Sequence, residues 1–248
     1  MLELNKIYLG DCLEVMKDID DKSIDCIIAD LPYGTTKCRW DTIISFEPLW
    51  LQYNRIIKDN GAIVLFGGEP FTSILITSNL KMFKFKYIWN KVKPTGFQMA
   101  NYRPMKVCED ICVFSKAPAT YVKNKESMIY NPQGLFECER VIKATKKSIA
   151  TNNGGDTTKA YIGKKSGFPN DLLEFYNSDK NRLHDTQKPI DLYKYLIKTY
   201  SNEGNLILDN CCGCGTIKVA ETISRNFIGI EKDEQFYKIA CEREFKAC

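Results

Sequence analysis

The sequence has no apolar run long enough to cross a membrane. Its longest apolar runs, such as residues 62–66 between Gly61 and Gly67, fall far short of the roughly 20 residues that a spanning helix needs. Glu3 and Lys6 interrupt the first residues of the chain, which therefore lack the continuous apolar core of a secretory signal. We expect one large soluble domain with an insertion, located in the cytoplasm and without membrane contact.

The sequence has one histidine, His184, and two close groups of cysteines that could supply metal ligands. Cys108 and Cys112 would lie about 13 Å apart along a strand, too far to share one ion. Residues 211–214 hold three further cysteines in a glycine-rich turn, far along the chain from His184. Others, such as Cys26, lie in apolar runs rather than in a small loop-rich framework. We expect reduced thiols and no metal ion.

No acidic residue occurs between Glu69 and Glu109. Between Lys81 and Lys106, seven basic residues are interleaved with six aromatic ones. Basic groups attract phosphates and aromatic rings stack on bases, so this composition favours a nucleic-acid partner. A solvated strand edge would have the same composition. The candidate contacts with nucleic acid in this segment are Lys91, Lys93 and Arg103.

The positive net charge of the chain comes from residues 117–183. This segment holds 11 Lys and Arg against 7 Asp and Glu, whereas the rest of the chain is balanced. It is rich in Lys, Asn, Gly, Thr and Ser, and 152–155 is its most turn-like point. We expect an inserted recognition region here, between parts 1–116 and 184–248 of one domain. Its candidate phosphate contacts are Lys143, Lys146 and Lys147, although lysines that only solvate a loop remain an alternative.

Short apolar runs that end at an acidic residue or glycine predict buried parallel strands. They are residues 26–29, 62–66, 206–208 and 227–230. Amphipathic segments of helical length lie between them, near residues 48–58, 71–80, 189–200, 216–224 and 234–245. This alternation predicts an α/β doubly wound sheet.

The first candidate site is Asp30-Leu31-Pro32-Tyr33-Gly34, directly after an apolar strand. Its polar groups are therefore expected at the carboxyl end of the strand, where open α/β sheets bind ligands. A base amino nitrogen gains positive charge as it attacks a methyl group, and a carboxylate with a backbone carbonyl would stabilise that change. Asp30 can supply the carboxylate, Leu31 the carbonyl and Tyr33 a face for stacking a base. A strand-ending turn would use the same residue types.

The second candidate site is the glycine turn of residues 209–216. A strand precedes the turn, a helical segment and a strand follow it, and that strand ends at Glu231. Glu231 lies 18 positions after Gly213, close to the roughly 20 at which an acid binds ribose hydroxyls in nucleotide-binding folds. Lys218 stands where the third glycine of a dinucleotide motif would fall. A nucleoside without a pyrophosphate fits better.

The third candidate site is His184-Asp185-Thr186-Gln187-Lys188-Pro189. Pro189 suits the first turn of a helix, where free backbone N–H groups and the helix dipole can hold a carboxylate. A simple helix start explains the same residues.

Together these segments resemble the permuted beta class of DNA amino-methyltransferases. Asp30-Leu31-Pro32-Tyr33 is similar to the family's D-P-P-Y, residues 184–189 to H-P-T-Q-K-P, and residues 209–216 to D-x-F-x-G-x-G-T. Gly10-Asp11-Cys12 is similar to the segment before the catalytic strand. The resemblance implies a Rossmann-like fold that uses S-adenosylmethionine, with a mixed, mostly parallel sheet, helices on both faces, a circularly permuted motif order and an inserted target-recognition region.

The resemblance also implies roles for particular residues. The catalytic residues would be Asp30, Leu31, Pro32 and Tyr33. The cofactor would contact Asp11, Cys12, Asp30, Thr186, Gln187, Lys188, Asp209, Cys211, Gly213, Gly215, Thr216, Glu231 and Lys232. Leu31, Asp185 and Cys211 depart from the family pattern. Leu31 keeps the backbone carbonyl that the chemistry uses, so the reaction type is expected to survive.

The family's activity leaves several functions open for this chain. N6-methylation of adenine is favoured, because the cytosine enzymes more often begin the catalytic motif with serine and this chain has Asp30. Cytosine-N4 methylation, an RNA adenine methyltransferase and an inactive DNA-binding relative are the alternatives. Methylation at carbon 5 of cytosine needs a cysteine nucleophile, which that family carries in a Pro-Cys pair. It is disfavoured because no proline in this chain is followed by cysteine. The expected partner is double-stranded DNA with the target base flipped out, in the cytoplasm of a bacterium or phage host, with a homodimer left open.

Overall fold

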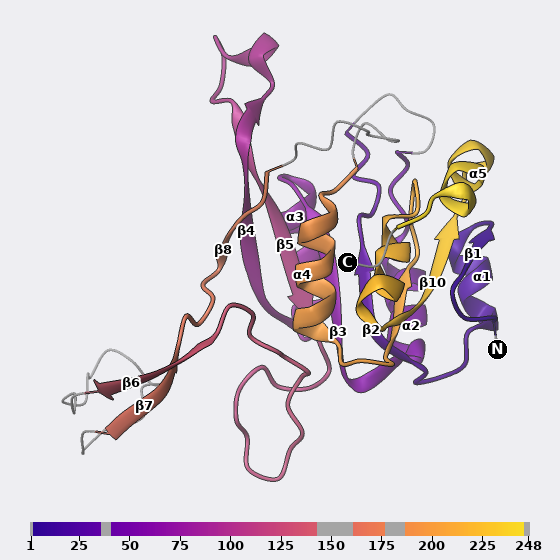
Figure 1. Cartoon of the computed structure of the whole chain (residues 1–248). Coiled ribbons are helices and arrows are strands. Elements are labelled where there is room, and N and C mark those ends of the chain that lie inside the picture. The colour runs from indigo at the N-terminus through magenta and orange to yellow at the C-terminus, as the bar shows by residue number, and fades with distance from the viewer. Residues whose placement is uncertain (1, 36–40, 143–160, 177–186, 246–248) are drawn as a thin grey trace. The chain divides into compact units, whose positions relative to one another are not determined.

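The computed structural model describes residues 2–35, 41–142, 161–176 and 187–245 of the 248-residue chain (Figure 1). It divides into two compact units. One consists of Met1–Asn131 with Asp171–Cys248, and the other of Pro132–Asn170. No helix in the described ranges has the length and apolar composition to cross a membrane.

An eight-stranded sheet forms the centre of the first unit, within the described residues, in the order β1-β10-β9-β2-β3-β5-β4-β8. The strands are β1 (Lys6–Leu9), β2 (Ile24–Ala29), β3 (Ile57–Gly67), β4 (Phe83–Thr95), β5 (Lys106–Phe114), β8 (Leu172–Glu174), β9 (Leu206–Asp209) and β10 (Asn226–Glu231). In this spatial order, neighbouring strands from β1 through β10, β9 and β2 to β3 are paired in parallel. Strand β5 is antiparallel to both its neighbours, and β8 is parallel to β4. The predicted mixed, mostly parallel sheet is confirmed, and the four apolar runs are β2, β3, β9 and β10.

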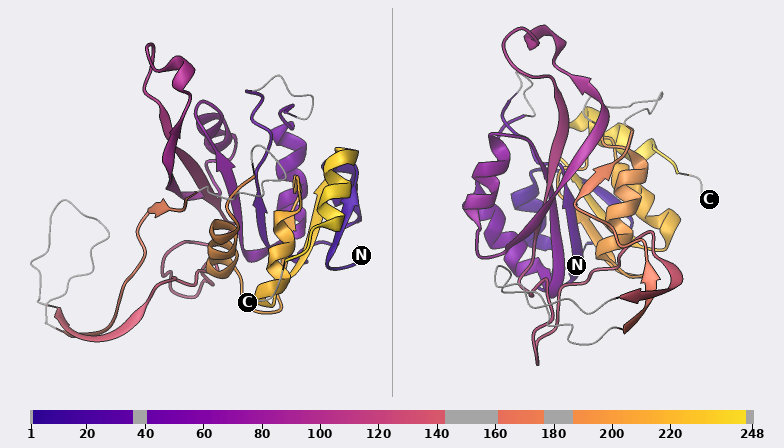
Figure 2. Two further views of the ribbon diagram at one scale, coloured as in Figure 1. Left: turned by 45° about the horizontal axis from the view of Figure 1, so that its top comes forward. Right: turned by 90° about the vertical axis from the view of Figure 1, so that its left-hand side faces the viewer.

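Helices cover both faces of this sheet (Figures 1 and 2). The helices are α1 (Cys12–Val15), η1 (Met16–Asp18), α2 (Phe46–Ile56), α3 (Phe71–Ser78), α4 (Ile190–Tyr200), η3 (Thr216–Ile223) and α5 (Glu234–Glu242), of which η1 and η3 are 3₁₀ helices. Alternate residues of β3 face the two layers. Ile63 and Leu65 share a core with α2 and α3, whereas Val64 and Phe66 share the other with α4 and η3.

Strands β4 and β5 continue beyond the sheet as a hairpin, which ends in the 3₁₀ turn η2 (Phe97–Met99) and projects from the sheet in Figure 1. The pairing register of the hairpin shifts between Asn90 and Thr95. Val92, in this interval, has a φ of 66°, which is the conformation of a bulge that bends a strand.

The second unit is a small antiparallel pair, β6 (Phe136–Ile142) and β7 (Tyr161–Ser166). This unit comprises residues 132–170, fewer than the predicted insertion of residues 117–183. Backbone hydrogen bonds from Ile129 to Asn60 and from Asn131 to Thr199 fasten residues before 132 to the first unit, and β8 extends the large sheet. A role of the inserted segment in target recognition stays a prediction, and Lys143, Lys146 and Lys147 lie outside the described residues.

Candidate active site

A cavity of about 1270 Å³ lies at the carboxyl ends of the parallel strands. Its walls come from the segments that follow β1, β2, β9 and β10, and from β4, β5 and the residues before α4. Parallel strands of an open α/β sheet all end at one edge, so residues far apart in the chain meet there. The first and second candidate sites of the sequence therefore share one cavity.

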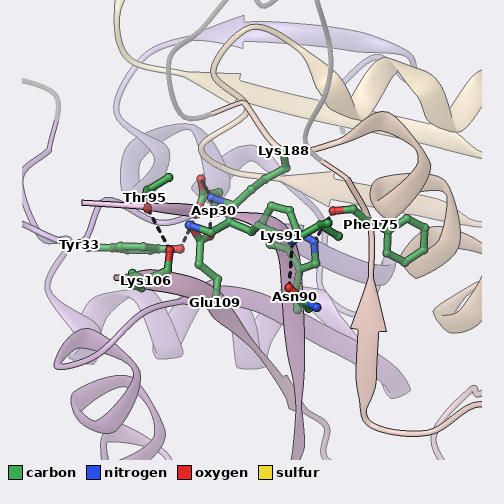
Figure 3. Close-up of polar contacts among 11 residues, drawn as sticks. Asp30, Tyr33, Asn90, Lys91, Thr95, Lys106, Glu109, Phe175 and Lys188 are labelled. Atoms are coloured by element: carbon green, nitrogen blue, oxygen red, sulfur yellow. Dashed lines mark hydrogen bonds and ion pairs between the residues drawn. The ribbon is translucent and has the colours of Figure 1, made fainter. Parts of the chain in front are cut away.

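Asp30 stands directly after β2 and has a partner on each carboxylate oxygen (Figure 3). The hydroxyl of Tyr33 donates to Oδ1 at 2.8 Å, and Lys188 Nζ donates to Oδ2 at 2.6 Å. Lys188 stands two residues before α4 and is 7% exposed. Lys188, from the third candidate site (residues 184–189), therefore places a cation beside Asp30 of the first (residues 30–34).

Lys188 also connects Asp30 to a second carboxylate, Glu109 on β5. Lys188 Nζ lies 3.4 Å from Glu109 Oε2, and Lys91 Nζ of β4 lies 3.0 Å from Glu109 Oε1. Burial alone would raise the pKa of Glu109, but the charges of Lys188 and Lys91 outweigh it and hold that pKa below its ordinary value. Burial would likewise lower the pKa of Lys188, but Asp30 and Glu109 hold it above its ordinary value. The four groups form a row of alternating charge.

The ring of Tyr33 forms part of the wall beside this row. It stacks on Phe71 with ring centroids 4.8 Å apart, and Lys188 Nζ lies 5.8 Å from its centroid. Burial, with the nearby Asp30 carboxylate, raises the pKa of Tyr33, so its hydroxyl keeps its proton and donates to Asp30. The loop after Tyr33 is held by Asp41, whose carboxylate accepts hydrogen bonds from the backbone N–H groups of Gly34 and Thr35.

Glu231, at the end of β10, lies across the cavity in contact with the glycine turn. Its Oε2 accepts from the backbone N–H of Gly213 at 2.7 Å, and its Oε1 accepts from that of Asp233 at 2.8 Å. Burial raises the pKa of Glu231. A carboxylate has about four acceptor positions, so Glu231 can still accept from two vicinal hydroxyls, as a ribose presents them.

Asp11 lies on the same side of the cavity and caps α1 through the backbone N–H of Leu13. Lys232 Nζ donates to its Oδ2 at 3.0 Å, which lowers the pKa of Asp11. Phe236 of α5 also lines this part of the cavity. Acidic acceptors beside an aromatic ring and a glycine turn fit the donors and flat base of a nucleoside.

Asp209 is buried beside the cavity and does not line it. Its carboxylate accepts from the hydroxyl of Tyr193 at 2.9 Å and from the backbone N–H of Cys211 at 3.1 Å. Burial raises the pKa of Asp209 to about 7. Asp209 therefore orders Tyr193 and the start of the turn, both of which line the cavity.

The glycine turn is held from behind by α5 and the residues after it. Gly215 has a φ of 75°, and a Cβ there would meet the backbone of Ala240 at 3.0 Å, so only glycine fits. The Arg243 guanidinium donates to the carbonyl of Cys214 at 3.1 Å and to the hydroxyl of Thr216 at 3.2 Å. The thiol of Cys214 donates to Gln187 Oε1 at 3.3 Å. These contacts set the shape of the turn around Gly213.

The structure brings most predicted site residues to the one cavity. Those that line it are Asp11, Cys12, Asp30, Leu31, Pro32, Tyr33, Gln187, Lys188, Cys211, Gly213, Thr216, Glu231 and Lys232, together with Lys91 and Lys93. Asp209 and Gly215 support the cavity without lining it, Arg103 lies on the hairpin, and His184, Asp185 and Thr186 lie outside the described residues.

Two features of the cavity were not predicted from the sequence, namely the pairing of Lys91 and the presence of Glu109. Lys91 is a candidate for contact with a phosphate, yet it is 9% exposed and paired with Glu109. Glu109 itself is not among the predicted residues, although it is the acid that ends the long acid-free stretch within an apolar strand. In the part of the chain that the structure describes, no group of three or more His, Cys, Asp and Glu could hold a metal ion.

Residues 24–242 match the N6/N4 family described as DNA methylase. Among curated proteins, the type II methyltransferase M.HpaI of Haemophilus parainfluenzae is 27% identical over 96% of this chain and 73% of its own length. The DNA adenine methyltransferase YhdJ of Escherichia coli is 26% identical over 97% of this chain and 83% of its own length.

Solved structures of DNA methyltransferases have the same fold. The complex of M1.HpyAVI with SAM has a TM-score of 0.61 at 22% identity, covering 96% of this chain and 99% of that one. The cytosine-N4-specific PvuII DNA methyltransferase has a TM-score of 0.69 at 17% identity, covering 97% of this chain and 86% of that one. The fold is thus shared with neighbours of differing sequence.

Proposed function

The chain belongs to the N6/N4 family of DNA methylases, and on that premise we propose that it methylates the N6 amino group of adenine in double-stranded DNA. Its methyl donor is S-adenosylmethionine. The observation that carries the proposal is Asp30, which lies in the same cavity as Glu231 and the glycine turn. A single cavity of about 1270 Å³ has room for a nucleoside cofactor and a base turned out of the duplex.

The residues around the glycine turn fit the cofactor. Glu231 would accept from the ribose hydroxyls, Asp11 would contact the adenine, and the turn at Gly213 would let the backbone approach the methionine end. When bound, the cofactor supplies an electrophilic methyl group on a sulfonium. Gln187, which is buried beside Cys214, would orient the amino-acid part.

The residues after β2 fit the base. Asp30 and the backbone carbonyl of Leu31 would accept the two amino hydrogens and stabilise the positive charge that develops on nitrogen. Tyr33 would stack on the base, since its ring already forms a wall of the cavity. Because Lys188 and the Tyr33 hydroxyl occupy one position on each Asp30 oxygen, they orient the carboxylate while other lone pairs remain for the base.

Adenine is favoured over cytosine by the residue that begins the catalytic motif. Asp30 stands where cytosine enzymes of this family more often have serine. YhdJ is named as an adenine methyltransferase and the PvuII enzyme as cytosine-N4-specific, so relatives of both kinds exist. Cytosine-N4 methylation is therefore the second candidate function.

The test is to incubate the purified chain with plasmid DNA and isotopically labelled S-adenosylmethionine. Digestion to nucleosides and mass spectrometry then identify the labelled product. We expect N6-methyladenine, and none from an Asp30→Ala variant that retains cofactor binding. If the labelled product is N4-methylcytosine, the second candidate function replaces the first. A parallel incubation with RNA tests the substrate class, and labelled RNA together with unlabelled DNA would overturn the choice of DNA.

Target recognition is proposed for the segment 117–183. Its excess of positive charge suits contact with phosphates, which would position base-reading side chains. Replacing Lys143, Lys146 and Lys147 together by alanine is expected to weaken DNA binding and lower the salt slope by about one for each lysine that binds a phosphate. Titrations across a salt series measure both, and unchanged binding at every salt concentration would contradict the role. Several relatives are named as type II methyltransferases, which supports a role for this chain in a restriction-modification system.

A further inference from the structure

The tip of the β4–β5 hairpin exposes aromatic side chains on an ordered backbone. Every residue from 92 to 104 is exposed, and Phe97 and Tyr102 are exposed to 80% and 83%. The backbone N–H groups of Tyr102 and Arg103 both donate to the carbonyl of Met99, and that of Met99 to Gly96. The tip therefore has its own local structure, and that structure turns the two rings outward.

Only cations accompany these rings among the charged residues of the tip. Lys93, Arg103 and Lys106 flank the tip, and no acid occurs between Glu69 and Glu109. Exposed rings without this charge would suit an apolar protein partner. Rings among exposed cations complement a polyanion whose interior offers flat surfaces for stacking, which is the chemistry of nucleic acid.

The hairpin joins the tip directly to the active-site cavity. Lys91, Lys93, Pro94 and Thr95 of β4 line that cavity. The base of the hairpin is anchored by Trp89, which is fully buried and donates from its indole nitrogen to the carbonyl of Phe175 at 3.0 Å. Nearer the tip, the hydroxyl of Thr95 donates to the carbonyl of Lys106 across the two strands. A duplex that delivers a base to the cavity would thus come within reach of the tip.

We propose that this tip is a second DNA-contact element, in which Phe97 and Tyr102 stack on base pairs next to the flipped target base. The inference rests on the proposed function, because it needs duplex DNA at the cavity. A flipped base leaves a gap in the stack, and an aromatic side chain that fills or flanks the gap lowers the cost of unstacking. Lys93 and Arg103 would hold the neighbouring phosphates.

The first test compares Phe97→Ala/Tyr102→Ala with a control that removes an equally exposed ring elsewhere. Tyr121 is 87% exposed, and its loop is hydrogen-bonded to Asn60, near the amino end of β3, and to Thr199, near the end of α4. The probe is a short duplex containing the site at which the wild-type chain methylates plasmid DNA. We expect the double variant to bind it at least about tenfold more weakly, with wild-type cofactor affinity and an unchanged salt slope, because every cation that binds a phosphate is kept. Tyr121→Ala should bind as the wild type does.

The second test measures stacking without relying on affinity. Tryptophan fluorescence is quenched when the indole stacks on bases, so Tyr102→Trp should lose emission when the duplex is added and Tyr121→Trp should not. Wild-type affinity of the double variant, or emission from Tyr102→Trp that DNA leaves unchanged, would overturn the inference while leaving the proposed function intact. A shift of the double variant from dimer to monomer, with wild-type DNA binding, would assign the tip to a second copy and also overturn it. A wild-type chain that neither methylates nor binds duplex DNA would overturn both.

Discussion

The two halves of the cavity hold their carboxylates in different ways. In the half that we propose to be catalytic, called the catalytic half, Asp30 and Glu109 are paired with the ammonium groups of Lys188 and Lys91. In the half that we propose to bind the cofactor, called the cofactor half, Glu231 is held by two backbone N–H groups, and Asp209 by a tyrosine hydroxyl and one backbone N–H. Asp11, which is paired with Lys232 at the rim, is the exception.

The difference shows in the directions of the pKa shifts. Cations hold the pKa of Glu109 below its ordinary value although the group is buried. Burial without a cation raises the pKa of Glu231, and that of Asp209 to about 7. The cations beside Glu109 thus favour its charged form. Burial of Glu231 and Asp209 instead shifts each group toward its protonated form.

The largest effect is expected from Asp30→Asn, which removes the negative charge of the Asp30 side chain and little of its volume. Methyl transfer should fall on the order of 1000-fold, as when a preorganised group at a developing charge is removed. Cofactor affinity measured by calorimetry should change little, because Glu231 and the glycine turn are untouched. The assignment of Asp30 fails if the purified variant turns over at the wild-type rate.

Lys188→Met breaks the row of alternating charge. We expect kcat to fall about 100-fold, since Asp30 would lose the group that orients it. Without the Lys188 charge the pKa of Glu109 should rise, so the acid limb of the pH profile of kcat/KM should move to higher pH. Lys188→Arg keeps the charge and is the control. A rate loss without any movement of the acid limb would show that Lys188 matters only for packing.

Glu231→Gln tests the cofactor half. The amide has one oxygen acceptor in place of two, so one backbone N–H or ribose hydroxyl loses its partner. We expect the Kd for S-adenosylmethionine to rise about tenfold, the cost of one hydrogen bond to a charged group, with kcat at saturating cofactor nearly unchanged. Calorimetry with the cofactor alone measures the first and initial rates the second. A fall in kcat with wild-type affinity would place Glu231 in the chemistry instead.

The smallest effect is on stability and comes from Asp209. Because burial raises its pKa to about 7, the folded chain binds more protons here than the unfolded chain between about pH 4 and pH 7. The contribution to stability is therefore present below that window and lost as the pH rises through it. Urea unfolding should show that Asp209→Asn loses less stability from pH 5 to pH 8 than the wild type, by on the order of 1 kcal/mol.

Glu109→Gln is the matched control for this pH effect. The pKa of Glu109 is shifted in the opposite direction, so its linkage lies below about pH 4.5 and its removal should not reduce the loss between pH 5 and pH 8. Equal pH dependence of the wild type and Asp209→Asn would contradict the raised pKa.

Much of the fold follows from local patterns in the sequence. The apolar runs before Asp30, Gly67 and Glu231 and the amphipathic segments between them predict strands and helices that the structure contains, because strand and helix periodicity act over a few residues. The order of the motifs likewise places Asp30, Gly213 and Glu231 at strand ends, where an open sheet binds its ligand.

The sequence by itself thus determined four parallel strands, the helical segments near them, the sheet type and the residues that follow those strands. Only the tertiary structure decided that Lys188 pairs with Asp30, 158 positions away, and that Lys91 pairs with Glu109. It also decided that Asp209 lies beside the cavity and that Phe97 and Tyr102 point outward on a hairpin tip. Pairing and burial depend on which side chains the folded sheet brings together, and no local pattern encodes a contact between distant parts of the chain.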